Sequence, residues 1–144
     1  MKKKNSYRLI AFFMLASLLP TGCGTIDQIH TNEVTTNFDE IFILYSKHLR
    51  WGHFKELTSF MTAEQIGPAM EIIAANTDKI GDRKVSKVQP LSWLLDEQAG
   101  TMTGDVTIEY YIPSRSVIRT ATDHQIWKLN GNVWQLDSGL PKLP

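Results

Sequence analysis

The chain has 144 residues, with 15 basic and 15 acidic side chains, so its formal net charge at neutral pH is zero. Four basic residues lie within the first eight positions, and the chain after position 22 therefore carries 15 less 4, or 11, basic groups against 15 acidic ones. These values predict one small domain. They exclude two large domains and a basic surface matched to nucleic-acid phosphates.

A basic stretch, an apolar run and small residues follow one another at the N-terminus, which is the pattern of a secretory signal. Residues 1–8 are basic, Leu9–Leu19 is apolar, and Thr21 and Gly22 come next. As a helix, the run would reach about 16 Å, against roughly 30 Å for a bilayer core, so a permanent transmembrane helix is not expected. Residues 1–22 are predicted to be a signal peptide.

Cys23 is the only cysteine in the chain and stands directly after this segment. The sequence Leu19-Pro20-Thr21-Gly22-Cys23 resembles a bacterial lipobox, and the resemblance implies that Cys23 is acylated and becomes the new N-terminus. Several acyl chains would hold the protein stably on a membrane surface. The alternative is a signal cut elsewhere, which leaves a free thiol in an oxidising compartment.

The residue after this cysteine is Gly24 rather than Asp. In this respect the chain is similar to Gram-negative lipoproteins of the outer membrane, which implies a place on the periplasmic face of that membrane. In a cell with one membrane, the same signal implies the outer face of that membrane. Either way, the expected location is the cell envelope.

Residues 23–36 are predicted to be the lipidated cysteine followed by a flexible tether. This stretch is rich in Gly, Thr, Asp, Asn and Gln, and it holds three isolated aliphatic residues, Ile26, Ile29 and Val34. Residues 37–144 show no second linker, repeat or low-complexity segment. They are predicted to form a single domain.

Two helical regions are predicted at the start of this domain. The first has Asn37 or Thr36 as its N-terminal cap. Its apolar residues, spaced by three and four, are Phe38, Ile41, Phe42, Tyr45 and Leu49. The second begins at the capping box Thr62–Gln65, in which each end residue is expected to bond the backbone amide of the other. Because Gly67-Pro68 interrupts it, two short pieces are predicted, ending near Asn76.

After Gly81 the pattern changes from helical spacing to alternation, and four antiparallel strands are predicted. They cover residues 84–96, 101–112, 116–129 and 133–137. Pro90 within the first strand implies an edge, a bulge or a break. In the second strand, the even-numbered residues from Met102 to Ile112 form the apolar face.

Because the second strand is apolar on one side only, the helices must cover that side of the sheet. The predicted fold class is therefore α+β, with N-terminal helices packed on one face of a curved four-stranded antiparallel sheet. From about Phe38 to Pro141, the chain resembles the nuclear-transport-factor-2-like superfamily, which has a cystatin-like roll. The resemblance rests on the opening helix, the Thr62–Gln65 start and the tryptophan-rich hairpin Trp127–Leu136. This superfamily includes isomerases, dehydratases, secretion-system assembly factors and binding modules, so the fold does not select a function.

Charged residues on the two middle strands are the candidates for acid and base chemistry. A three-residue turn between these strands places Glu109 opposite Arg119. The same turn places Asp105 opposite Asp123, and the pKa values of such an acid pair would separate. A two-residue turn instead places Asp105 opposite His124, as a carboxylate that orients a base. Both registers also allow solvated cross-strand pairs without a function.

Histidine spacing gives no support for a metal site. His48 and His53 are five residues apart, which on a straight helix leaves them about 140° apart around the axis. They could not bind one metal ion together in that geometry. The chain also lacks metal-ligand spacings and a phosphate-binding glycine loop, so no cofactor is expected.

The four tryptophans allow two interpretations. Trp127 and Trp134 flank the last hairpin and are expected in the core. Trp51 and Trp93 either pack in the core or line the open end of the sheet, where an aromatic pocket would suit a hydrophobic ligand. With the charged candidates, the predicted pocket comprises Trp51, Trp93, Asp105, Glu109, Arg119 and His124.

These patterns favour a membrane-anchored lipoprotein of the cell envelope that binds a protein partner or a small hydrophobic ligand without catalysis. The predicted anchor and the lack of a specific catalytic constellation are the grounds for this interpretation. One alternative is an isomerase or dehydratase that uses an Asp and a His. Another is an assembly component of an envelope or secretion complex. A homodimer is compatible with the superfamily, and no nucleic-acid partner is expected.

Overall fold

The computed structural model describes residues 25–76 and 82–144, with side chains from Val34 onward except that of Thr36. The predicted signal peptide, Cys23 and Gly24 lie outside the described residues. Packing is described here for the unit Val34–Pro144. None of the described helices is both long enough and apolar enough to cross a bilayer.

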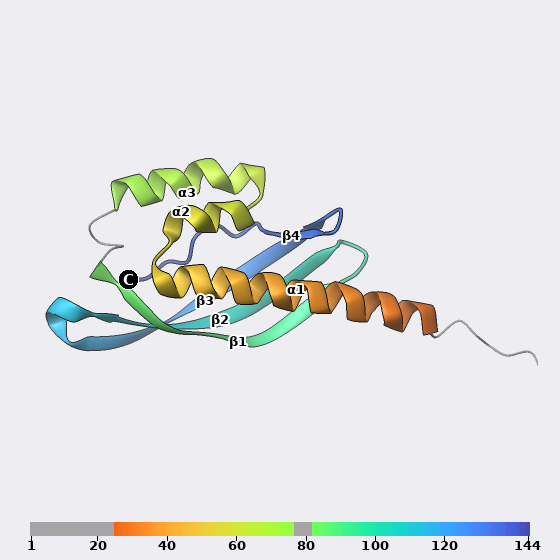
Figure 1. Ribbon diagram of the computed structural model, residues 1–144, viewed down its shortest axis with the longest axis horizontal. Helices are drawn as coiled ribbons and strands as arrows, with labels where there is room; N and C mark the ends of the chain where they lie inside the picture. Colours follow the sequence, from red (N-terminus) through yellow and green to blue (C-terminus); the bar gives the residue numbers. More distant parts are fainter. Residues whose placement is uncertain (1–24, 77–81) are drawn as a thin grey trace, which may run out of the picture. The chain divides into compact units, whose positions relative to one another are not determined.

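Three helices precede four strands in the described part of the chain. The helices are α1 (Thr25–Trp51), α2 (Phe54–Leu57) and α3 (Ala63–Ala75), with the 3-10 turn η1 (Thr58–Phe60) after α2. The strands are β1 (Lys84–Asp96), β2 (Thr101–Ile112), β3 (Val117–Asn130) and β4 (Val133–Leu136), with the 3-10 turn η2 (Pro113–Arg115) after β2. The strands pair antiparallel in the order β1-β2-β3-β4, and the helices lie on one side of this curved sheet (Figure 1). The predicted α+β class is confirmed.

α1 begins at Thr25 rather than near Asn37, so the segment that was expected to be a tether is helical from Thr25 on. Val34 gives a physical reason for the earlier start. It lies four residues before Phe38, on the same side of the helix, and packs against the core. The aliphatic residue that looked isolated in a polar stretch therefore continues the apolar face of α1.

α3 runs through Pro68 as one helix, and the predicted division into two pieces is wrong. Ala69 and Ile73, one turn apart, are buried on the inner side of the helix. Pro68 removes the helical donor for the Glu64 carbonyl, but both residues are exposed and water can supply a replacement. Burial of the inner side therefore outweighs the lost backbone hydrogen bond.

Thr62 begins α3 with the extended backbone of an N-cap, but its side chain does not cap the helix, so the predicted side-chain capping box does not form. The Thr62 hydroxyl donates instead to the Asp137 Oδ1 atom, at 2.9 Å. Its backbone amide donates to the Leu136 carbonyl at 3.0 Å, and Met61 forms a parallel bridge to Leu136. The start of α3 is thus attached to the last strand.

The core lies between α1 and the sheet and is rich in aromatic rings. Phe38 meets the rings of Trp93, Trp127 and Trp134 edge to face, with centroids 4.9, 5.6 and 5.4 Å away. Trp127 and Trp134 are buried, as predicted. Trp93 is half-buried and also meets Phe42 at 5.2 Å, so its ring contributes to the core.

The faces of the sheet follow the predicted alternation. The even-numbered residues of β2 from Met102 to Ile112 are buried beneath the helices. β1 is an edge strand, and its pairing with β2 shifts register between Val85 and Lys87 and between Pro90 and Ser92. The second shift is the irregularity that Pro90 predicted, because proline cannot donate a hydrogen bond to the ladder.

Candidate functional site

The Asp105 carboxylate and the His124 imidazole are in contact on the side of the sheet that faces away from the helices. The residues Pro113–Ser116 connect β2 to β3. This four-residue connection gives the two strands the same register as the predicted two-residue turn. Asp105 therefore faces His124, and its Oδ1 atom lies 2.7 Å from His124 Nδ1. The alternative pairing of Asp105 with Asp123 is wrong.

Their surroundings make this pair weak as a catalytic unit. The His124 and Asp105 side chains are 61% and 50% exposed, and an exposed ion pair contributes roughly 0 to 1 kcal/mol. Glu109 is opposite Thr120 rather than Arg119, and its carboxylate accepts a hydrogen bond from Ser86 Oγ at 2.7 Å. The predicted Glu109–Arg119 pair is therefore wrong as well.

A polar network lies on the other side of the sheet, under α1. Gln125 is fully buried and its Oε1 atom accepts from Trp127 Nε1 at 3.0 Å. Its Nε2 atom donates to Asp123 Oδ2 at 2.9 Å and lies 3.5 Å from the Tyr45 hydroxyl. Tyr45 is itself fully buried. One amide thus connects an aromatic N–H group, a carboxylate and a phenol inside the domain.

The network perturbs the pKa values of its two titratable members. Burial raises the pKa of the Tyr45 hydroxyl, and the nearby negative charge of Asp123 raises it further. Burial also raises the pKa of Asp123 above its ordinary value. The hydrogen bond from Gln125 and the charges of His124 and Lys142 lower the Asp123 pKa in part. This arrangement favours a proton on Tyr45 and penalises the charged form of Asp123.

The raised Asp123 pKa predicts a pH dependence of stability. A folded-state pKa above the unfolded value means that the folded state binds the proton more tightly, so the stabilising contribution is complete below the unfolded pKa and is lost as pH rises through the folded one. We expect Asp123→Asn to remove this loss while its amide oxygen still accepts from Gln125. Thermal unfolding should show that the Tm of Asp123→Asn rises relative to the Tm of the wild type as the pH increases from 4 to 7.

Asp39→Asn is the matched control for this prediction, because Asp39 is an exposed residue of α1. It removes one carboxylate from the surface of the domain and leaves the Gln125 network intact. A parallel pH profile of Asp123→Asn and the wild type would contradict the assignment. Such a result would mean that Asp123 titrates like a solvated carboxyl group.

Gly52 brings two histidines together at the end of α1. It has a positive φ of 71°, a left-handed conformation that glycine adopts without strain, and it ends the helix directly after Trp51. The chain turns back, and the His53 amide bonds the His48 carbonyl at 2.9 Å. The two imidazole centroids then lie 5.6 Å apart. The straight-helix separation predicted for these histidines is wrong, because the helix stops between them.

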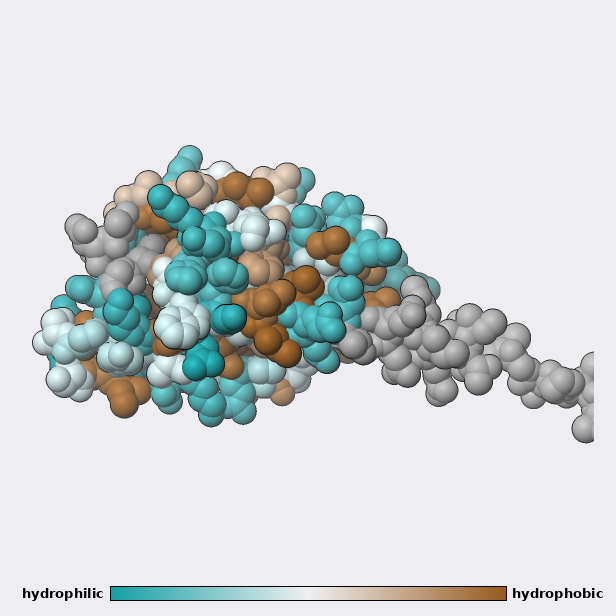
Figure 2. All heavy atoms as spheres, viewed as in Figure 1, coloured by the Kyte–Doolittle hydropathy of each residue, from teal (hydrophilic) through white to brown (hydrophobic). Residues whose placement is uncertain are grey.

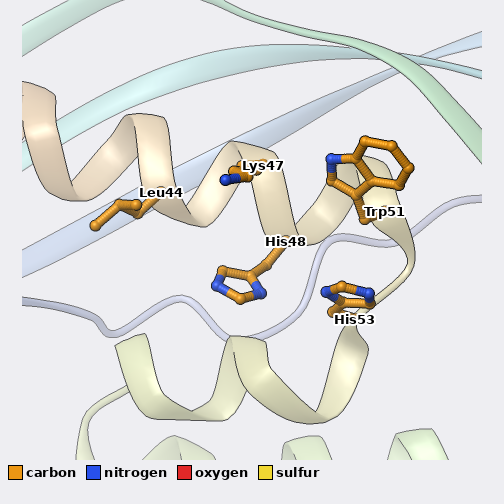
Figure 3. Close-up of a pocket in the computed structure, with 5 residues that line it drawn as sticks. All are labelled: Leu44, Lys47, His48, Trp51 and His53. Carbon is orange, nitrogen blue, oxygen red and sulfur yellow. The ribbon is translucent and has the colours of Figure 1, made fainter.

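These histidines line a surface hollow of about 330 Å³ together with Leu44, Lys47 and Trp51. Figure 3 shows Leu44, Lys47, His48 and Trp51 projecting from α1, with His53 in the turn that follows. Trp51 is 71% exposed and Leu44 is 46% exposed. The hollow therefore combines exposed apolar surface with basic and imidazole groups, and none of its five lining residues is acidic.

His48 gives the hollow an unusual polar group. Its ring lies against those of His53 and Phe60, with centroids 5.6 and 5.7 Å away. Within the described part of the chain, the buried His48 Nδ1 atom has no hydrogen-bond partner. The described residues contain no group of three or more His, Cys, Asp or Glu side chains that could hold a metal ion.

The six residues of the predicted pocket do not share one cavity. Trp51 lies in the hollow at the end of α1, whereas Trp93 packs against Phe38 in the core. Asp105 and His124 lie on the opposite side of the sheet. Sequence reasoning missed the Gln125 network and the hollow. The signals for them were Gln125, which is two residues before Trp127 on β3, and Gly52, which stands between the two histidines.

The C-terminal segment covers part of the inner side of the sheet. The Tyr110 hydroxyl donates a hydrogen bond to the Pro144 carbonyl, and Leu140 and Leu143 pack against the core.

Comparisons with protein families, with curated proteins and with solved structures found no match to this chain.

Proposed function

We propose that this protein is a membrane-anchored lipoprotein of the cell envelope, and that its α+β domain is a non-catalytic binding module. The observation that carries the binding half is the hollow at the end of α1. There, a tryptophan that is 71% exposed stands beside an exposed leucine and a lysine. An exposed tryptophan beside a hollow is a common anchor for binding, because its ring offers a large apolar area and one polar N–H group.

The charged groups of the domain support binding better than catalysis. Asp105 and His124 are in contact, but the Asp105 side chain is half exposed and the His124 side chain more than half exposed. Water therefore reaches both groups. Asp123 is half-buried on the inner side of the sheet, where Gln125 donates a hydrogen bond to one of its oxygens. Neither acid belongs to the hollow. An isomerase or dehydratase would need such groups inside a pocket that excludes water.

The predicted lipobox supports the anchoring half of the proposal. Cys23 is two residues before the start of α1, so an acylated Cys23 would hold the domain next to a membrane. The outer membrane is the proposed location in a Gram-negative cell, on the basis of Gly24. The nuclear-transport-factor-2-like superfamily remains the proposed relationship.

One experiment in cells tests both halves. A photo-reactive residue is placed at Trp51 in the full chain, and the cells are fractionated after illumination. We expect membrane-bound protein with a covalent adduct at this position, either to a partner or to a lipid. Cys23→Ser should move the protein out of the membrane fraction, because no acyl chain can be attached.

Thr122, an exposed residue of β3, provides the matched control position for the photo-reactive residue. An adduct that forms equally well at Thr122 would contradict a specific site at the hollow. Unchanged membrane retention of Cys23→Ser would contradict the anchor. Adducts to the components of one large complex would favour the assembly role, and turnover lost in His124→Ala would favour an enzyme.

A further inference from the structure

α1 has a second apolar face, opposite the one that it buries. Ile43 is 65% exposed, Leu44 46% and Trp51 71%, while Phe42 and Tyr45 are buried. Leu44 and Trp51 are seven residues apart and therefore lie two turns apart on one side of the helix. A helix on the surface of a water-soluble domain normally presents polar residues there. Figure 2 shows exposed hydrophobic atoms, in brown, on the face of the molecule that α1 crosses.

Two exposed cations accompany this apolar face. Lys47 and Arg50 lie on the same outward side of α1, between Ile43 and Trp51 in the sequence. We call the set Ile43, Leu44, Lys47, Arg50 and Trp51 the α1 outer patch. Glu40, one turn before Leu44, marks its N-terminal limit. The adjoining hollow adds His48 and His53 and no acid. The patch is therefore apolar and basic.

From this combination we infer that the α1 outer patch lies against an anionic lipid surface. Tryptophan is enriched at the headgroup level of membranes, since its ring is apolar and its N–H group is polar. The negative surface potential of an anionic leaflet attracts lysine and arginine side chains. Trp51, Ile43 and Leu44 would enter the headgroup region, and Lys47 and Arg50 would bind lipid phosphates.

The inference rests on the proposed membrane anchor, which makes lipid the surface available to this patch. Ile43 follows Cys23 by 20 positions, so the patch is close in sequence to the proposed anchor. The patch is therefore within reach of the membrane that an acylated Cys23 would enter. A protein partner would more often match the basic groups with an acidic surface of its own, and it is the alternative that the test separates.

Quenching of tryptophan fluorescence by brominated acyl chains tests the contact directly. Trp127 and Trp134 are 0% and 1% exposed, and Trp93 packs on Phe38 and Phe42, so Trp51 is the tryptophan that lipid can reach most easily. The full lipidated chain is reconstituted with brominated phosphatidylglycerol vesicles. We expect strong quenching that Trp51→Phe largely removes. The double variant Lys47→Gln, Arg50→Gln should at least halve it.

Flotation with phosphatidylcholine vesicles reports the anchor separately, because these vesicles lack the anionic lipid that the patch is inferred to bind. Protein that does not float contradicts the proposed anchor. Quenching of Trp51 is measured whether or not the protein floats. Equal quenching of wild type and Trp51→Phe, or none in the wild type, would overturn the lipid contact. Equal quenching in phosphatidylcholine would overturn the role of the two cations. A protein captured through position 51 in cells would also overturn the lipid contact, but it would agree with the proposed binding module.

Discussion

Gly104→Ala is expected to cost about 3 kcal/mol of stability or more, because the added methyl group meets backbone and ring atoms at once. A Cβ atom at Gly104 would lie 2.2 Å from the Ser92 carbonyl oxygen and 2.4 Å from the Cε3 atom of Trp93. Gly104 is paired with Trp93 across β1 and β2, so the indole ring lies over the glycine. Relief requires a shift of the β1 backbone or of a ring held by Phe38.

Thermal unfolding followed by far-UV circular dichroism measures this loss, which should lower Tm by more than about 10 °C. Gly67→Ala is the matched control. A Cβ atom at Gly67 meets nothing within 4 Å, and Gly67 lies on an exposed part of α3. It should gain up to about 1 kcal/mol, because alanine favours the helix over the unfolded chain. Equal effects of the two substitutions would contradict the close approach at Gly104.

Gln125→Leu should destabilise the domain by roughly 2 to 4 kcal/mol although leucine is of similar size, because each buried polar group left unpaired costs about 1 to 3 kcal/mol. The Trp127 N–H group would lose its acceptor, and Asp123 would lose its amide donor. Loss of this donor should also raise the pKa of Asp123 further, since the Gln125 hydrogen bond lowers it.

Chemical denaturation compares Gln125→Leu with Gln89→Leu, an exposed position on β1. The control should stay within about 0.5 kcal/mol of the wild type. A comparable result for Gln125→Leu would mean that water or a neighbouring side chain replaces both hydrogen bonds. In that case the network would not be the structural element that we describe.

The sequence was sufficient to predict the sheet and the core face of α1, because burial of one face imposes a regular spacing of apolar residues. The spacing of Phe38, Phe42, Tyr45 and Leu49 predicted the helix, and the alternation of β2 predicted which residues are buried. Boundaries were less predictable. The polar residues before Asn37 suggested a tether, yet α1 begins at Thr25.

The candidate site depended on three-dimensional information that spacing does not contain. The pairing of Asp105 with His124 required the length of one turn, and two registers were equally compatible with the pattern. The hollow required the left-handed Gly52, which ends α1 between two histidines. Spacing places Gln125 and Trp127 on one side of β3, but the network also required the position of Tyr45 of α1 next to that strand.

The attachment of Met61 and Thr62 to Leu136 has a consequence for aggregation. A sheet edge with unpaired backbone groups can add a strand from another molecule. β4 is the edge strand on that side, and at Leu136 its backbone is already bonded to Thr62. On the opposite edge, β1 carries Lys84, Pro90 and two register shifts, which oppose strand addition. Both edges therefore carry features that oppose the addition of a strand from another copy of the chain.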